Sequence, residues 1–196
     1  MKLLPLCTPE VFELVASWLG RKENYQWLDF GGGRRAVTPA LLKIMSQRDS
    51  HLMRVYTRPG TDIPIGIVGL NNVDPTFKTG TLWGVAGETS FHSRGYASIA
   101  ASKLLGIAFR DLGLRAVNTW VVDHNPSLRS VERMGFRFIG RQRLCHRIDG
   151  RPYDRLLFDL LAEEHQEVEL GRRRRHGAPE PHVEPVLEKR AAVAVR

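Results

Sequence analysis

The stretch SFHSRGYASIA, residues 90–100, joins an apolar run to a segment with helical periodicity. Backbone amides remain unpaired at the start of a helix and carry the positive end of the helix dipole, so a phosphate placed there gains hydrogen bonds and favourable electrostatics. Gly95 would let the backbone approach such a ligand, and Arg94 could add a charge-assisted contact. The alternative is a plain turn, in which Arg94 is only solvated.

Other reactive residue types give weaker signals. The stretch GGGRR at residues 31–35 lacks the preceding strand and the GKS/T ending of a P-loop, so we interpret it as a flexible connection. Cys7 and Cys145 are far apart and belong to no cluster with metal-ligand spacing, and we expect Cys145 to be buried in a late strand. We therefore predict no metal site and no disulfide framework, as in a reducing cytoplasm.

Length and charge limit the class of protein. A chain of 196 residues, 42% hydrophobic, predicts one main domain. The net charge of +8 indicates an anionic ligand, an acidic partner or a nucleic acid without choosing among them. No apolar run approaches the ~20 residues that cross a bilayer. The start MKLLPLC lacks the small residue expected before a lipoprotein cleavage site, so we expect a mature, cytoplasmic protein without a membrane anchor.

Composition changes sharply near residue 163. Residues 171–196 include the run RRRR, several prolines and almost no large apolar side chains, so they cannot bury enough surface to offset the entropy of ordering. We predict a folded domain over residues 1–162 and a disordered, Arg/Pro-rich tail over residues 163–196. The arginine run could contact nucleic acid or an acidic partner, or could simply be a solvated tail.

Hydrophobic periodicity predicts an α+β order of elements. Helices are expected at residues 10–19, 39–47, 96–112 and 127–134, with Thr8 and Thr38 as N-caps and Gly113 as a C-terminal stop. Strands are expected at residues 51–58, 63–70, 81–86, 116–122, 136–146 and 153–161. Short turns between the first three strands indicate an antiparallel meander, and Asp149-Gly150 indicates a final hairpin.

The segment His92-Ser93-Arg94-Gly95-Tyr96-Ala97 resembles the pyrophosphate loop, Q/R-x-x-G-x-G/A, of the GNAT superfamily of acyl-CoA N-acyltransferases. The segments FRDLGLRAV (109–117), NPSLRSVERMGF (125–136) and GRPYDRLLF (150–158) resemble, in the same order, its ribosomal-protein N-terminal, polyamine and aminosugar acetyltransferases. The resemblance covers residues 1–162 and is strongest from Gly84 onward. His92 and Ser93 depart from the pattern at the outer edge of the loop.

This resemblance implies a fold and a cofactor. The fold is a GNAT-like mixed, mostly antiparallel twisted sheet flanked by helices, with a splayed central strand pair formed by residues 81–86 and 116–122. In the family, the pantetheine arm of acetyl-CoA (coenzyme A) lies in the gap. Main-chain groups around Gly84, Val85 and Ala86 would pair with that arm like an extra strand. Asn125 is carried over as a further cofactor contact, although one residue is missing between it and Ser127 relative to the family's N-x-x-S.

The resemblance also implies direct attack of an amine on a thioester, without a covalent enzyme intermediate. Ser127 matches the family's serine and could hydrogen-bond the departing sulfur, but it could equally be a helix N-cap. Glu88, Asp123 and His124 follow the two splayed strands and are alternative candidates for the base that accepts the amine's proton.

Three functions therefore remain in competition. The first is an N-acetyltransferase that uses acetyl-CoA and a primary amine of a small molecule or a protein N-terminus, and a homodimer is compatible with it. The second is a catalytically weak GNAT-like module that binds coenzyme A, with the basic tail contacting nucleic acid or an acidic partner. The third is a longer-chain acyltransferase that uses acyl-CoA or an acidic acyl carrier protein attracted to the positive surface.

Overall fold

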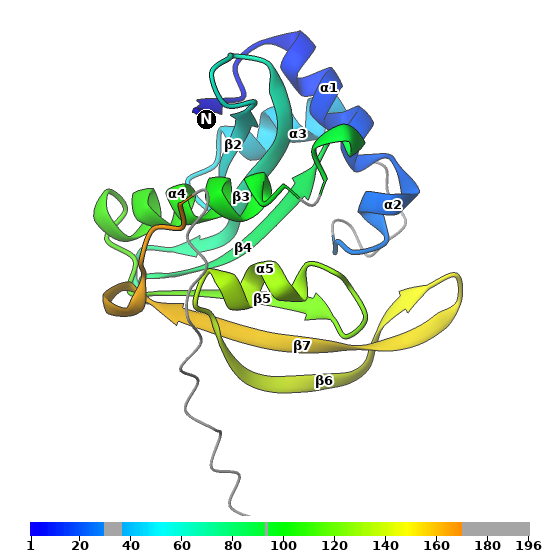
Figure 1. Cartoon of the computed structure of the whole chain (residues 1–196), viewed down its shortest axis with the longest axis vertical. Coiled ribbons are helices and arrows are strands. Elements are labelled where there is room, and N and C mark those ends of the chain that lie inside the picture. The colour runs from blue at the N-terminus through cyan, green and yellow to red at the C-terminus, as the bar shows by residue number, and fades with distance from the viewer. Residues whose placement is uncertain (30–36, 93, 170–196) are drawn as a thin grey trace, which may run out of the picture.

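The computed structural model describes residues 1–29, 37–92 and 94–169. Its helices are α1 (Pro9–Leu19), α2 (Lys22–Tyr25), α3 (Pro39–Ser46), α4 (Tyr96–Arg110) and α5 (Leu128–Arg133), with short 3₁₀ turns η1 (Thr89–Phe91) and η2 (Ala162–Glu164). Its strands are β1 (Leu3–Pro5), β2 (Leu52–Thr57), β3 (Pro64–Asp74), β4 (Thr79–Ala86), β5 (Ala116–Val122), β6 (Arg137–Ile148) and β7 (Arg151–Leu161) (Figure 1).

The strands form one seven-stranded sheet in the order β1-β2-β3-β4-β5-β7-β6. Every neighbouring pair is antiparallel except β4 and β5, which are parallel because α4 crosses over between them. The predicted mixed, mostly antiparallel α+β sheet is therefore confirmed. The meander from β1 to β4 lies on one side of the parallel pair, and the β6–β7 hairpin lies on the other side (Figure 1).

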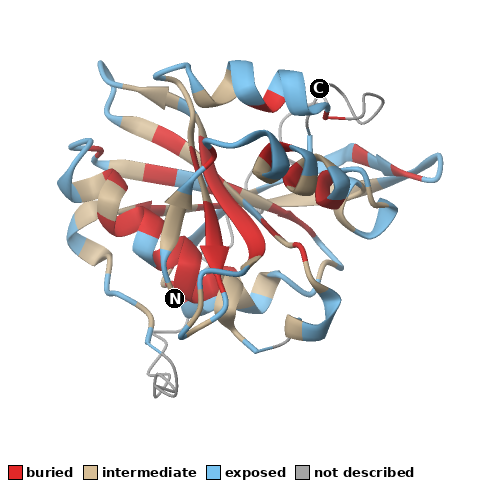
Figure 2. Ribbon diagram, turned by 90° about the horizontal axis from the view of Figure 1, so that it is seen from above, coloured by how far each residue is buried: buried red, intermediate tan, exposed pale blue. Residues whose placement is uncertain are grey.

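Helices cover both faces of this sheet. Helix α4 packs Ala100, Leu104 and Leu105 against one face, together with Val131 of α5 and Met134 just after it. Helices α1 and α3 cover the other face in a second core that contains Val15, Trp18 and Leu42. Buried residues therefore concentrate in the central strands and on the helix faces that meet them (Figure 2).

Local signals set the ends of the predicted helices. The hydroxyls of Thr8 and Thr38 accept hydrogen bonds from the amides of Val11 and Leu41, as N-caps do. Gly113, just after α4, has a φ of 65°, a conformation that most side chains disfavour. Asp149 and Gly150 both have positive φ and close the β6–β7 hairpin as expected.

The packed part of the chain extends beyond the predicted boundary at residue 162. The amide of Val168 donates to Ser102 Oγ of α4 at 2.9 Å, and His165 Nε2 lies 3.2 Å from the same oxygen. The His165 ring also lies 5.4 Å from the Phe109 ring, measured between centroids. Residues 163–169, predicted as the start of a disordered tail, thus lie against α4, while residues 170–196 are outside the described residues.

Within the described ranges, no helix is long and apolar enough to span a bilayer.

Candidate functional site

The parallel strands β4 and β5 separate along their length. They pair only from Thr79 to Thr81 on β4 and from Ala116 to Asn118 on β5. Beyond these residues, the Thr119 hydroxyl reaches across to the carbonyl of Leu82 at 3.0 Å. The strand ends then diverge toward the side where α2 lies (Figure 1), so the predicted splayed pair is present.

The opening exposes the main chain of β4 near Gly84. Gly84 is exposed, and a Cβ added to it would meet Val68 Cγ1 at 3.2 Å. The next residue, Val85, is buried in the core beneath α1 and α3, so its side chain anchors the strand from the opposite face. Beyond residue 81, the edge of β4 that faces β5 is free of a strand partner in the described structure and could accept an extended ligand.

Helix α4 begins beside this opening with uncapped amides. Gly95 precedes it with a φ of 77°, and no side chain caps the helix. The Ser98 hydroxyl donates back to the Gly95 carbonyl at 2.9 Å and leaves the first amides of the helix, at Tyr96, Ala97 and Ser98, without a side-chain cap. These amides and the helix dipole form a suitable cradle for an anion.

Arginine side chains surround this cradle. A Cβ added to Gly95 would lie 2.9 Å from Nη1 of Arg133, which comes from α5. The guanidinium carbons of Arg94 and Arg58 each lie 5.9 Å from the centroid of the Phe91 ring. Sequence reasoning selected only Arg94, because Arg58 and Arg133 reach the loop through tertiary packing.

The outer edge of the loop departs from the family pattern in a specific way. The predicted residue His92 places Nε2 3.1 Å from the carbonyl of Ala86, the last residue of β4. This contact ties the loop to the predicted pantetheine-binding strand. The predicted residue Ser93 lies outside the described residues, as does the GGGRR stretch at residues 31–35.

Glu88 lies just past the end of β4. Its carboxylate is half-buried and accepts a hydrogen bond of 2.9 Å from the indole Nε1 of Trp18, a fully buried residue of α1. A Cβ added to the neighbouring Gly87 would clash with the same indole, so glycine is required for this close approach. The carboxylate is therefore held in a fixed place on the β4 side of the opening.

Asp123 and His124 lie at the end of β5, on the other side of the opening. His124 Nδ1 is 3.1 Å from Asp123 Oδ1. If Nδ1 carries the proton and donates it to the carboxylate, Nε2 becomes the acceptor. The imidazole packs against Trp27 and Tyr153, with centroid distances of 5.2 and 4.4 Å. Within the described residues, no hydrogen bond or ion pair joins this pair to Glu88, so the candidate bases follow the ends of two different strands.

The Ser127 side chain does not cap α5. Asn125 Oδ1 accepts the Ser127 amide at 2.8 Å, so Asn125 supplies the side chain that closes the turn. Ser127 has helical dihedral angles, and its hydroxyl makes no capping bond. The N-cap interpretation of this hydroxyl is therefore wrong, and within the described residues the side chain is exposed and has no hydrogen-bond partner.

A polar network that the sequence did not predict lies near the end of β5. His146 Nε2 is 2.6 Å from the carbonyl of Gln26, and Arg155 Nη2 is 3.0 Å from His146 Nδ1. Arg155 also pairs with Asp29 at 2.9 Å and stacks 3.8 Å from the centroid of the Trp120 ring. Burial is the main cause that lowers the pKa of His146.

Cys145 precedes His146 on the same strand and is exposed, so the expectation that it is buried is wrong. Strand β6 is at the edge of the sheet, and its register with β7 shifts between Gln142 and His146. The irregular backbone leaves Cys145 at the surface while the neighbouring His146 is buried. Within the described ranges, no group of three or more His, Cys, Asp or Glu side chains is arranged to hold a metal ion.

Comparison with known families gives one match. Residues 2–137 match the model described as an acetyltransferase (GNAT) domain. A comparison with curated proteins gives no match.

Several solved structures share the fold. A probable acetyltransferase superposes with a TM-score of 0.69 at 20% identity, over 82% of this chain and 92% of that chain. The spermidine N-acetyltransferase from Vibrio cholerae in complex with CoA and spermine superposes with a TM-score of 0.72 at 15% identity, over 83% of this chain and 96% of that chain. A probable GNAT-family acetyltransferase from Chromobacterium violaceum superposes with a TM-score of 0.66 at 22% identity, over 83% of this chain and 87% of that chain.

Proposed function

The chain belongs to the GNAT acetyltransferases, which are acyl-CoA-dependent enzymes that use acetyl-CoA. On that premise we propose that it transfers an acetyl group to a primary amine of a small molecule or a protein N-terminus, by direct attack of the amine. The observation that carries this proposal is the separation of β4 and β5 beside the uncapped start of α4. An extended strand edge and an anion cradle thus adjoin one opening.

The residues at this opening fit coenzyme A. Its pyrophosphate would be held by the amides of Tyr96, Ala97 and Ser98 and by the arginines around them, since Gly95 leaves no Cβ in the way. Main-chain groups of Gly84 to Ala86 would hold the pantetheine amides. Bound acetyl-CoA supplies an activated acetyl group, and an amide C–N bond forms as the thioester C–S bond breaks.

Two groups are proposed for the amine's proton. Glu88 on the β4 side is fixed by the Trp18 indole, which orients its carboxylate. His124 on the β5 side is oriented by Asp123, which would leave Nε2 as an acceptor. Either group could accept the proton directly or through one water.

Ser127 is proposed as the donor to the departing sulfur. Its hydroxyl makes no capping bond, because Asn125 closes the turn, and it is exposed at the start of α5. Helix α5 also brings Arg133 to the Gly95 loop. The same short helix would thus contact both the sulfur and the pyrophosphate of the cofactor.

The decisive experiment is thiol release from acetyl-CoA with a panel of acceptors: aminosugars, N-terminal peptides, amino acids and spermidine, the last because of the Vibrio cholerae structure. We expect acceptor-dependent release with at least one class. Stabilisation of the protein by coenzyme A without any acceptor-dependent release would instead favour a binding module. Parallel assays with longer acyl-CoAs would reveal a longer-chain acyltransferase.

A further inference from the structure

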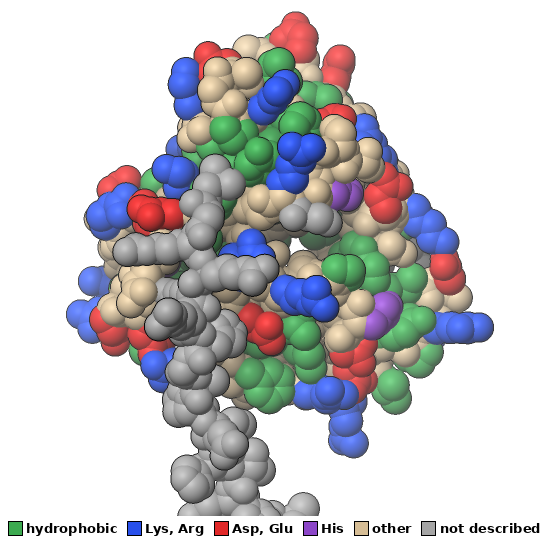
Figure 3. Space-filling view, in the orientation of Figure 1, with side chains coloured by type: hydrophobic (Ala, Val, Ile, Leu, Met, Phe, Trp, Pro, Cys, Tyr) green, Lys and Arg blue, Asp and Glu red, His purple; other side chains and the backbone are tan. Residues whose placement is uncertain are grey.

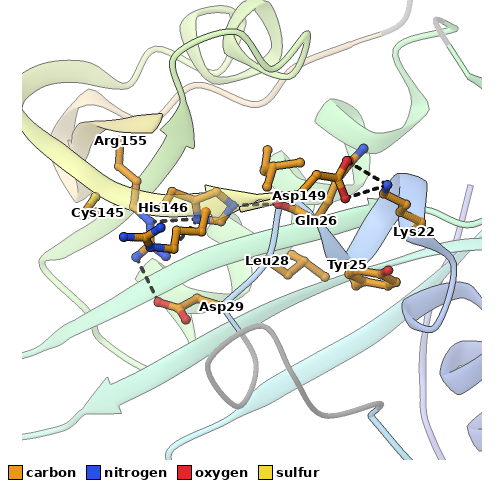
Figure 4. A pocket seen from close by; sticks show the side chains of 11 residues that line it. Lys22, Tyr25, Gln26, Leu28, Asp29, Cys145, His146, Asp149 and Arg155 are labelled. Atoms are coloured by element: carbon orange, nitrogen blue, oxygen red, sulfur yellow. Dashed lines mark hydrogen bonds and ion pairs between the residues drawn. The ribbon is translucent and has the colours of Figure 1, made fainter. Parts of the chain in front are cut away.

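A cavity of about 480 Å³ lies between α2 with its following segment and the β6–β7 hairpin. Its lining includes Lys22, Asp29, Asp149 and Arg155, which Figure 4 labels, and also Arg147. This volume lies within the usual range for small-molecule sites of roughly 300–1,000 Å³.

The segment from Trp18 to Asp29 connects this cavity to the opening between β4 and β5. At its start, the Arg21 guanidinium donates to the Gly87 carbonyl at 2.6 Å, just past β4. At its end, Asp29 pairs with Arg155, which stands opposite Val122, the last residue of β5. The segment therefore joins the end of β4 to the end of β5, and the cavity lies next to the end of β5, because Arg155 lines it.

Cations outnumber anions around the cavity. Lys22 is paired with Asp149 at 2.7 Å, and Arg155 is paired with Asp29 at 2.9 Å. Arg147 has no carboxylate partner in the described part of the chain. Its Nη1 donates to the Gly150 carbonyl at 3.2 Å. On the face shown in Figure 3, Lys and Arg side chains lie interspersed with Asp and Glu side chains.

His146 also lines the cavity and carries no charge in this arrangement, in which its Nε2 donates to the Gln26 carbonyl. Its Nδ1 then accepts from Arg155, an arrangement that requires the neutral imidazole. Only 14% of the Arg155 side chain is exposed, and its guanidinium stacks on Trp120. The Arg155 hydrogen bonds occupy Nε, Nη1 and Nη2 once each, so further N–H donors of this fixed group remain for a ligand.

We propose that this cavity selects the acceptor by holding an anionic group, such as a carboxylate, that the acceptor carries beyond its amine. Arg147 and Arg155 are the specificity residues, since guanidinium groups bind carboxylates through paired hydrogen bonds. A polycationic acceptor is disfavoured, because its distal ammonium would meet the unpaired Arg147. The inference rests on the proposed acetyl transfer and adds to it the chemical class of the acceptor.

Acceptors that differ only at the distal end test this inference: 5-aminopentanoate, pentylamine and 1,5-diaminopentane. All three present the same primary amine on a chain of the same length. With the full-length protein and acetyl-CoA, we expect kcat/KM for the aminopentanoate to exceed that for the diamine at least tenfold, with pentylamine between them. A diamine equal to or better than the aminopentanoate would overturn the inference while leaving acetyl transfer intact.

Charge reversal provides a matched pair of variants. Arg147→Glu should lower the ratio of kcat/KM for aminopentanoate over diamine at least tenfold. Arg151→Glu makes the same charge change in the same hairpin, at an exposed residue that does not line the cavity, and should keep the ratio within about twofold. Equal ratios in the two variants would also overturn the inference.

Direct binding measurements distinguish failure of the proposed function from failure of this inference. If none of the three amines releases thiol, calorimetric titration of 5-aminopentanoate and of 1,5-diaminopentane into the complex with coenzyme A decides the matter. Preferential binding of the aminopentanoate, lost in Arg147→Glu and kept in Arg151→Glu, would sustain the inference without acetyl transfer. Equal or absent binding of the two probes would overturn it.

Discussion

The hydroxyl of Ser127 is exposed and makes no capping bond at the start of α5, because Asn125 closes that turn. Ser127→Ala should therefore change the free energy of unfolding by less than about 0.5 kcal/mol, which is the low end of a lost N-cap. As a donor to the departing sulfur, its loss should lower kcat while acyl-CoA affinity stays unchanged. Urea unfolding and steady-state kinetics with saturating acetyl-CoA measure the two effects.

Asn125→Ala is the matched control, because it removes the side chain that closes the turn. It should destabilise the protein more than Ser127→Ala does, by about 1 kcal/mol. A wild-type kcat in Ser127→Ala would remove this hydroxyl from the mechanism.

Gly95 and Gly113 allow conformational strain to be separated from ligand binding. Both have positive φ, 77° and 65°, so alanine at either position should cost about 1–2 kcal/mol of stability. Only Gly95 lies at the uncapped start of α4, where an added Cβ would approach Arg133. We expect coenzyme A affinity to fall at least tenfold, about 1.4 kcal/mol, in Gly95→Ala and to be unchanged in Gly113→Ala. Calorimetric titration checks this, and equal affinities would show that the loop holds no phosphate.

At the scale of elements, His146 joins the segment after α2 to the β6–β7 hairpin. Burial lowers its pKa below the ordinary value near 6.5, so the folded state favours the neutral ring. Its contribution to stability is complete above pH 6.5 and is lost as the pH falls through the lowered pKa of the folded state, because the unfolded chain binds the proton first. Unfolding in urea at pH 7.5 and 5.5 should therefore show a smaller pH-dependent loss in His146→Gln than in wild type. The same loss in both proteins would contradict this assignment.

The elements that the sequence predicted are those with local signals. Thr8 and Thr38 cap their helices, and Asp149-Gly150 makes the hairpin turn, because each acts on neighbouring residues. The separation of β4 from β5 follows no periodicity and was expected only from the family resemblance. The contact between Gln26 and His146 joins residues 120 positions apart, and the short α2 has no buried residue to give it a hydrophobic pattern. Its position depends on tertiary contacts alone.

At the scale of the whole molecule, different helices lie on the two sides of the opening between β4 and β5. The candidate anion cradle lies at the start of α4, where α5 brings Arg133, while α1, α2 and the hairpin lie on the other side of the opening (Figure 1). A cofactor and an acceptor would thus approach the divergent strands from different elements. A homodimer, a nucleic-acid contact of the arginine run and a cytoplasmic location stay predictions from the sequence.

The end of the packed domain can be located by truncation. A chain ending at Glu169 keeps the contacts of His165 and Val168 with α4, whereas a chain ending at Glu164 loses them. Composition predicts that residues 170–196 add no core, so the longer truncation product should match the full chain in melting temperature and coenzyme A affinity. The shorter product should lose about 1–3 kcal/mol of stability, since it removes hydrogen bonds to Ser102 and apolar contact with α4. Thermal and urea unfolding measure both. A longer product less stable than the full chain would mean that the Arg/Pro-rich segment packs on the domain. Equal stability of the two truncation products would mean that the folded domain ends near residue 162, as composition predicts.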